Sequence, residues 1–231
     1  MSALHRRIAA LLMLGLAAAG SRAQTGEPAH FTGVQVSGNA QVTLRQGDQD
    51  GWRVLGDADS GRGADVRVVG DRLQLNTRNN WKFWSSERPR VEVQMRDLRR
   101  LVISGSSEVQ VLGPMKVGEV SVSISGAGSV RMDDLQAQAL RFDISGAGDG
   151  DLAGQVGELR LSVSGKGRLA AENMKAMRAT VSISGVGHAD VWAVEDLRIS
   201  VSGVGSVNYW GNPRVTRSTS GVASVEAKGG K

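Results

Sequence analysis

The chain has 231 residues, of which 40% are hydrophobic and only 4% aromatic, with 31 glycines and no cysteine. This composition excludes a wholly disordered chain, disulfides, thiolate metal sites and a catalytic thiol, and it predicts a narrow aliphatic core. The formal charge is +5, and removal of the three arginines before Gln24 leaves +2, so the sequence does not indicate the clustered basic face that nucleic-acid binding needs.

Residues 1–23 have the pattern of an export signal. Arg6 and Arg7 precede an apolar run over residues 8–20, and small residues surround Ala23. The apolar run is shorter than the about 20 residues that a membrane-spanning helix needs. We therefore expect cleavage after Ala23, no stable membrane insertion afterwards, and an extracytoplasmic protein that is periplasmic, secreted or at the cell surface.

Residues 24–90 predict an irregular β-rich region. Apolar and polar residues alternate over 33–48, and shorter strands are expected over 52–55, 65–69 and 72–76, separated by Gly and Asp turns. We interpret this region as an N-terminal cap with the first coils of the domain that follows, because terminal repeats have one face in water and depart from the pattern.

Three aromatic residues interrupt the strand pattern between residues 76 and 90. Trp81, Phe83 and Trp84 lie there among Asn, Lys, Arg and Ser. The rings either cover the open end of the core or belong to an exposed loop that presents them to a ligand. They are therefore candidate binding residues.

From residue 91 to 231 a unit containing S-G-x-G recurs every 18 to 21 residues. In the first six copies apolar side chains occupy the positions two and four residues before its first glycine, and serine precedes that glycine in every copy. Such a period is typical of stacked repeats, with like side chains about 4.8 Å apart in neighbouring coils. The sequence predicts an all-β, right-handed parallel β-solenoid (β-helix) with one S-G-x-G corner per coil. The first glycines are Gly105, Gly126, Gly146, Gly165, Gly185, Gly203 and Gly221.

The glycine pair of each corner has a backbone explanation. A tight corner repeated coil over coil is expected to need positive φ angles and to leave little room for a Cβ atom. This explanation also argues against a phosphate or calcium loop at residues 146–151, because Lys166, Arg168 or His188 occupy the matching positions of later coils. Neither a metal nor a cofactor is expected.

The outward columns allow two interpretations. Asp149 and Asp151 share a face with His188 and Asp190 about 10 Å away, which could be the acid pair of an inverting glycosidase. The alternative is charge alternation along a solvated ladder. We expect no serine to share a site with a histidine and an aspartate, and we expect no enzyme activity.

Trp192 and Trp210 fall at the same position of successive coils. They are expected to stack, either as a platform for a sugar ring or a partner's side chain, or as a shield over the end of the strand. They complete the candidate binding residues.

Four segments resemble a known family. These are V-S-G-N-A-x-V-T-L-x-Q-G-D (residues 36–48), L-x-x-L-V-I-S-G (98–105), the repeated S-G-x-G, and S-V-N-Y-W-G-N-P-R-V-T-R-S-T-S-G-V-A-S-V (206–225). They are similar to the GIN domain (DUF2807) family of bacterial putative auto-transporter adhesin heads, over residues 30 to 227. The resemblance implies a β-solenoid, an exported setting and a role in adhesion, and it brings no catalytic residues.

The sequence thus favours an exported, non-catalytic, adhesin-like module whose faces contact a cell-surface glycan or an envelope protein. Two alternatives stay open. One is a structural envelope protein without a dissociable ligand, and the other is a polysaccharide lyase or hydrolase.

Overall fold

The computed structural model describes residues 30–55, 64–77 and 88–231, and all regular structure within these ranges is β-strand. Trp81, Phe83 and Trp84 lie outside the described residues. The fifteen strands form one sheet. They are β1 (Gly33–Ser37), β2 (Gln41–Gln46), β3 (Gly51–Leu55), β4 (Ala64–Val69), β5 (Arg72–Thr77), β6 (Arg90–Met95), β7 (Arg100–Ile103), β8 (Glu108–Ile124), β9 (Ala127–Ile144), β10 (Ala147–Val163), β11 (Lys166–Ile183), β12 (Val186–Val201), β13 (Val204–Trp210), β14 (Arg214–Thr219) and β15 (Val222–Ala227).

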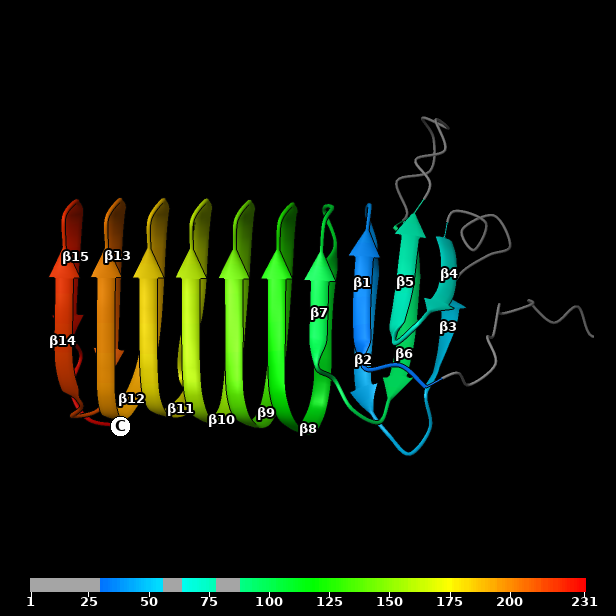
Figure 1. Cartoon of the computed structure of the whole chain (residues 1–231), viewed down its shortest axis with the longest axis horizontal. Helices are drawn as coiled ribbons and strands as arrows, with labels where there is room; N and C mark the ends of the chain where they lie inside the picture. The colour runs from blue at the N-terminus through cyan, green and yellow to red at the C-terminus, as the bar shows by residue number, and fades with distance from the viewer. Residues whose placement is uncertain (1–29, 56–63, 78–87) are drawn as a thin grey trace, which may run out of the picture.

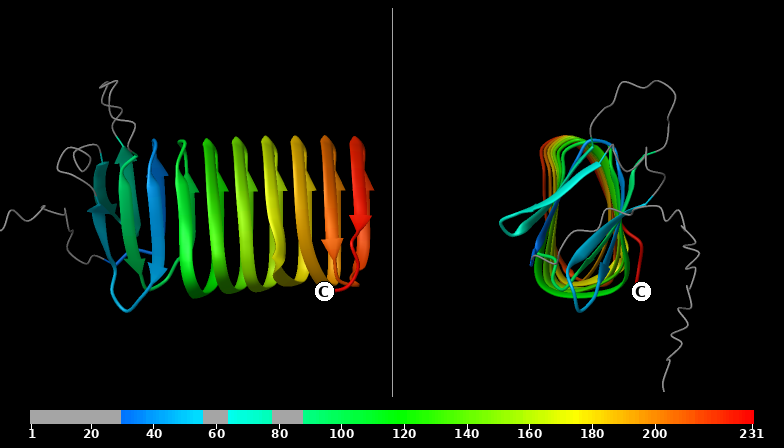
Figure 2. Two further views of the ribbon diagram at one scale, coloured as in Figure 1. Left: turned by 180° about the vertical axis from the view of Figure 1, so that it is seen from behind. Right: turned by 90° about the vertical axis from the view of Figure 1, so that its right-hand side faces the viewer.

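The sheet winds into a solenoid of flattened coils (Figures 1 and 2). Each of the strands β8 to β12 runs from one S-G-x-G corner to the next, bends once on the way, and pairs in parallel with the coil on either side. The predicted columns are in register, since Val122 pairs with Phe142, and Leu161 pairs with both Phe142 and Val181. The prediction of a parallel β-solenoid is confirmed.

The core is a thin stack of aliphatic side chains inside the coils. The column two residues before each corner glycine is buried to 1% exposure or less from Ile103 to Val201. The serines next to those glycines are exposed. A fully buried Ile or Val contributes about 1.5 to 3 kcal/mol relative to the exposed state. Because a single coil cannot enclose this column, the stacking of neighbours stabilises the fold.

The corner glycines are required for close packing and not for their φ angles. None of the seven lies in the left-handed region, so that part of the prediction is wrong. A Cβ atom at Gly146 would instead overlap the carbonyl oxygen of Gly126, and the later corners repeat this geometry. Positive φ angles occur at the opposite bend, at Gly113, Gly154 and Gly211. The pairing of neighbouring coils shifts at that bend, which accommodates the different coil lengths.

The N-terminal strands do not stack in chain order. The β1 and β2 strands lie between β7/β8 on one side and β5/β6 on the other, so β5 and β6 form the outermost coil (Figure 1). The antiparallel strands β4 and β3 pair with β5 and β6 at this end. Among the residues that the structure describes, no helix could cross a membrane.

Candidate functional site

A groove follows the S-G-x-G corners along the length of the solenoid. Its volume is about 1070 Å³, and it extends from Ser106, just before β8, to Ser224 in the last coil. We call it the corner groove. The corners stack in one straight row (Figure 1), so the groove is straight and repeats its chemistry once per coil.

The floor of the corner groove is the second glycine of each motif. A Cβ atom at Gly148 would lie 2.7 Å from the carbonyl oxygen of Gly128, and one at Gly128 would lie 2.9 Å from the Ser107 carbonyl oxygen. A Cβ atom at Gly148 would also lie 3.1 Å from the buried Ile124 side chain, so it would point toward the core and not into the groove. Close packing therefore explains these glycines, and the backbone forms the floor of the groove. Glycine occupies five of the seven floor positions, which are Ser107, Gly128, Gly148, Gly167, Gly187, Gly205 and Ala223.

The two walls differ in character. The residues that precede the floor positions form one wall, whose side chains are small in the first coils, basic at Lys166 and apolar in the last coils. The residues that follow the floor positions form the second wall, which is polar. The first wall contains Ser106, Ala127, Ala147, Lys166, Val186, Val204 and Val222, and the second contains Glu108, Ser129, Asp149, Arg168, His188, Ser206 and Ser224. Such a surface offers backbone, hydroxyl and charged groups side by side to an elongated ligand.

A second, more polar groove of about 770 Å³ adjoins the corner groove across this polar wall. In it, Arg131 lies 3.4 Å from Asp151 and 3.1 Å from Asp133. The Asp190 side chain is only 8% exposed and lies 3.6 Å from Arg168. These pairs match the interpretation of the aspartates as members of a charge ladder, in which Asp151 and Asp190 have committed partners.

Contrary to the expectation from the sequence, the structure brings together a serine, a histidine and an aspartate. His188 Nδ1 lies 2.6 Å from Ser206 Oγ, and His188 Nε2 lies 2.8 Å from Asp190 Oδ2. Asn208 donates a hydrogen bond of 2.9 Å to the other oxygen of Asp190. The signal was available in the sequence, since a stacked coil places residue 206 directly beside residue 188.

This constellation orients an imidazole at the groove wall, and acyl transfer would in addition require an oxyanion hole. An oxyanion hole needs backbone or side-chain donors aimed at the reacting oxygen. The β13 strand that carries Ser206 pairs in parallel with β12 on one side and with β15 on the other, so its backbone amides donate hydrogen bonds within the sheet. Within the described residues, no group of three or more His, Asp or Glu side chains could hold a metal ion.

Trp192 and Trp210 are neighbours in register, as expected, and lie beyond the corner groove near the opposite bend. Both are partly exposed. The Lys231 ammonium lies 5.5 Å and 5.4 Å from the two ring centroids, and Lys175 lies 5.8 Å from that of Trp192. Cations over the rings suit the electron-rich ring faces. Whether the pair also binds a ligand stays a prediction.

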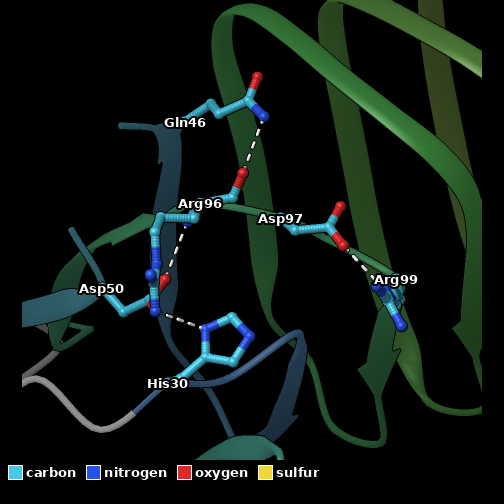
Figure 3. Close-up of polar contacts among 6 residues, drawn as sticks. All are labelled: His30, Gln46, Asp50, Arg96, Asp97 and Arg99. Atoms are coloured by element: carbon cyan, nitrogen blue, oxygen red, sulfur yellow. Dashed lines mark hydrogen bonds and ion pairs between the residues drawn. The ribbon is translucent and has the colours of Figure 1, made fainter. Parts of the chain in front are cut away.

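A third polar cluster lies near the N-terminal end of the solenoid, among residues that precede β1, precede β3 and follow β6 (Figure 3). The Asp50 carboxylate, 1% exposed, accepts hydrogen bonds from the Arg96 backbone amide (2.8 Å) and guanidinium (3.0 Å), and lies 2.8 Å from His30 Nδ1. Burial alone would raise the pKa of Asp50, but the hydrogen bonds from His30 and Arg96 together lower that pKa below its usual value. Because these groups satisfy one another, we assign the cluster to stability.

Replacement of Asp50 by Asn is expected to lower the free energy of unfolding by about 2 to 4 kcal/mol at pH 7, because Arg96 loses its buried anion. The Asp50 contribution in the wild type is complete above about pH 4, the pKa of an unfolded aspartate, and is lost as the pH falls through the lower folded pKa. The variant should lack this acid dependence. Urea unfolding at a series of pH values measures both effects.

The control for this prediction is Asp97→Asn. Asp97 pairs with Arg99 at 2.8 Å on the surface (Figure 3), and exposed pairs contribute about 0 to 1 kcal/mol. Equal losses in the two variants would contradict a special role for Asp50.

Solved structures of bacterial proteins share this fold. A putative adhesin from Bacteroides fragilis NCTC 9343 has a TM-score of 0.84 at 22% identity, with 89% of this chain and 96% of that chain covered. A putative adhesin and a putative lipid binding protein from Parabacteroides distasonis ATCC 8503 have TM-scores of 0.72 and 0.70 at 20% and 19% identity, with the same shares covered. At these identities the likeness shows the fold alone.

Among curated protein sequences, none matches the chain. A family model does match, over residues 30–213, which is most of the described solenoid. The chain therefore belongs to the family described as putative auto-transporter adhesin, head GIN domain.

Proposed function

We propose that the mature protein is an exported, non-catalytic binding module that holds an extended cell-surface polymer, in the first place a glycan, in the corner groove. The observation that carries the proposal is the continuity of this groove, in which a glycine floor and a polar wall recur in coil after coil. A polysaccharide also repeats along a line and combines apolar ring faces with hydroxyl groups. Serine, aspartate, arginine and histidine side chains on one wall can donate to and accept from those hydroxyls.

Export is part of the proposal. It is supported by the basic, apolar and small-residue pattern of residues 1–23, and by the adhesin description of the family. The proposed mature chain begins at Gln24 and acts outside the cytoplasm, in the periplasm, at the cell surface or after secretion.

A polysaccharide-cleaving activity has less support. An inverting acid pair needs one carboxyl group free to protonate the leaving oxygen and another free to activate water. Asp190 is engaged with His188 and Asn208, and Asp151 lies beside Arg131. A structural envelope protein without a dissociable ligand is the remaining alternative, and the experiment below separates it from a binding module.

Replacement of Ala147 by Trp is expected to lower retention of the mature protein on a glycan or envelope preparation about tenfold or more. Ala147 is exposed on the groove wall, so the indole would fill the groove without entering the core. A tenfold loss corresponds to about 1.4 kcal/mol of binding free energy. The matched control is Gln138→Trp, an exposed site that lines neither groove.

The mass of the mature protein, measured after export, checks the expected cleavage site after Ala23.

Each outcome decides between the alternatives. Equal retention of the Ala147→Trp and Gln138→Trp variants would show that the polymer does not use the corner groove. Absence of wild-type retention on every preparation would favour the structural protein. The same assay tests the proposed aromatic contacts with alanine variants of Trp81, Phe83, Trp84, Trp192 and Trp210. Unchanged retention of these variants would show that the aromatic side chains do not contact the polymer.

A further inference from the structure

The apolar side chains left on the surface are concentrated in one column. Within the described residues four large hydrophobic side chains are exposed, and three of them, Val186, Val204 and Val222, are 53%, 52% and 73% exposed and stacked in register. The fourth, Val69, is 48% exposed and lies on β4 at the other end of the solenoid. Scattered exposed valines need no explanation, but a contiguous apolar strip marks a contact surface.

This strip is the wall of the corner groove in its last three coils. At about 4.8 Å per coil, the three valines form an apolar strip about 10 Å long. The floor beside them is the backbone of Gly187, Gly205 and Ala223. The strip therefore faces a channel that suits one narrow, unbranched apolar group.

Two cations mark the inner end of the strip. Lys166 pairs in register with Val186, and Arg168 pairs in register with His188, with Gly167 as the floor between them. Lys166 is exposed, and the Arg168 side chain is 63% exposed. The nearby carboxylates are Asp190, which lies 3.6 Å from Arg168 and also contacts His188 and Asn208, and Asp149 one coil away. Lys166 is thus the cation best placed to meet an anion at the point where the valine strip begins.

We propose that the last three coils of the corner groove bind a single aliphatic chain that carries an anionic headgroup. The chain lies along Val186, Val204 and Val222, and the headgroup lies between Lys166 and Arg168. The inference rests on the proposed function in that the corner groove is a binding site, and it adds a ligand that a glycan-binding groove would not need.

A membrane surface fits this geometry less well than a single chain. Interfacial binding uses a broad apolar face with Trp, Phe or Leu side chains that enters the bilayer. The three valines form a line one residue wide along one side of the groove floor. His188, Ser206 and Ser224 form the wall on the other side of that floor. Contact with one extended chain uses all three valines at once.

The test uses octyl phosphate below its micelle concentration, titrated into the mature protein by calorimetry. Replacement of both Val186 and Val204 by Thr keeps the shape and the β-branch of the side chains but removes two methyl contacts, so binding should weaken about tenfold. The matched control, Val69→Thr, should bind as the wild type does. Lys166→Gln should weaken binding several-fold and reduce its salt dependence.

Other results would overturn the inference. Inorganic phosphate binding as tightly as octyl phosphate would remove the apolar part, and octyl glucoside binding equally well would remove the anionic part. Binding to phosphatidylglycerol vesicles but not to octyl phosphate would indicate a membrane surface. A dimer that the double variant abolishes would indicate a second copy of the chain.

The two proposals fail separately. If Ala147→Trp abolishes polymer retention while the Val186→Thr/Val204→Thr variant binds octyl phosphate like the wild type, the groove function stands and this inference falls. If octyl phosphate binds as expected while the polymer is retained equally by the Ala147→Trp and Gln138→Trp variants, the inference stands and the glycan proposal falls.

Discussion

Replacement of Gly146 by alanine should lower the free energy of unfolding by more than about 3 kcal/mol, or prevent folding. The added Cβ atom would overlap the backbone carbonyl of Gly126 and approach that of Ser125 to 2.7 Å. No side chain can move away to relieve this contact, because every atom it meets belongs to the backbone of the preceding coil. The two coils would have to separate, and the hydrogen bond from the Ala147 amide to the Gly126 carbonyl (2.9 Å) would weaken with them.

The matched control is Gly118→Ala. Gly118 also lies in a solenoid strand, but an added Cβ atom there would meet nothing within 4 Å, and its φ angle is not in the left-handed region. This change should be neutral or stabilise by up to about 1 kcal/mol, since alanine lowers the entropy of the unfolded chain. Thermal and urea unfolding of both variants measure the difference. A similar, small effect at the two glycines would contradict the close-packing explanation of the S-G-x-G motif.

The solenoid could be predicted because its signal is carried by many equivalent positions. Each inward column repeats an apolar residue in coil after coil, and a slip by one residue in any coil would turn that coil's core residues outward. Ile124, Ile144 and Val163 therefore specify one another's register, and the structure has them paired. Little of this inference depended on any single residue.

The order of the N-terminal coils could not be predicted in the same way. The strands β1/β2 and β5/β6 have the same alternation, and either pair could stack on β7/β8. The order depends on long-range contacts, such as the amide group of Gln46. It donates to the backbone carbonyls of Arg96 (2.9 Å, Figure 3) and Lys116 (2.8 Å) and accepts from the Lys116 amide. A single polar side chain of this kind leaves no periodic trace in the sequence.

The candidate site could be predicted only in part. The sequence directs attention to large residues such as Trp192, whereas the floor of the corner groove is formed by backbone. Glycines such as Gly148 are explained by close packing against the preceding coil and the core, and the groove forms only when the corners are stacked. The contact of His188 with Ser206 follows from the same stacking, which a coil-by-coil comparison of the sequence could have found.

One core position departs from its column, and a second position compensates for it. Phe142 replaces the aliphatic residue that the neighbouring coils have at this position, Val122 and Leu161, and is fully buried. Gly150 occupies a position where the preceding coil has Val130 and the following coil has Leu169. A Cβ atom at Gly150 would lie 2.9 Å from the Phe142 ring and 2.7 Å from Leu169, so the ring fills the space that the glycine leaves. The two residues together keep the packing density of this coil.

Phe142→Val is therefore expected to lower the free energy of unfolding by about 2 to 4 kcal/mol, because it opens a cavity beside Gly150. Gly150→Val is expected to lower the free energy of unfolding by about 1 to 3 kcal/mol, because the added side chain crowds the Phe142 ring. The double variant restores the Val122 and Val130 arrangement of the preceding coil and should recover much of the loss, with a coupling energy of about 2 kcal/mol in urea unfolding. Phe142→Val combined with Gly118→Ala should be additive, since Gly118 faces open space. Additive losses at Phe142 and Gly150 would mean that each coil fills its own interior independently. Coupled losses would mean that a residue larger than its column requires is tolerated only where a contacting residue in the same coil is correspondingly smaller.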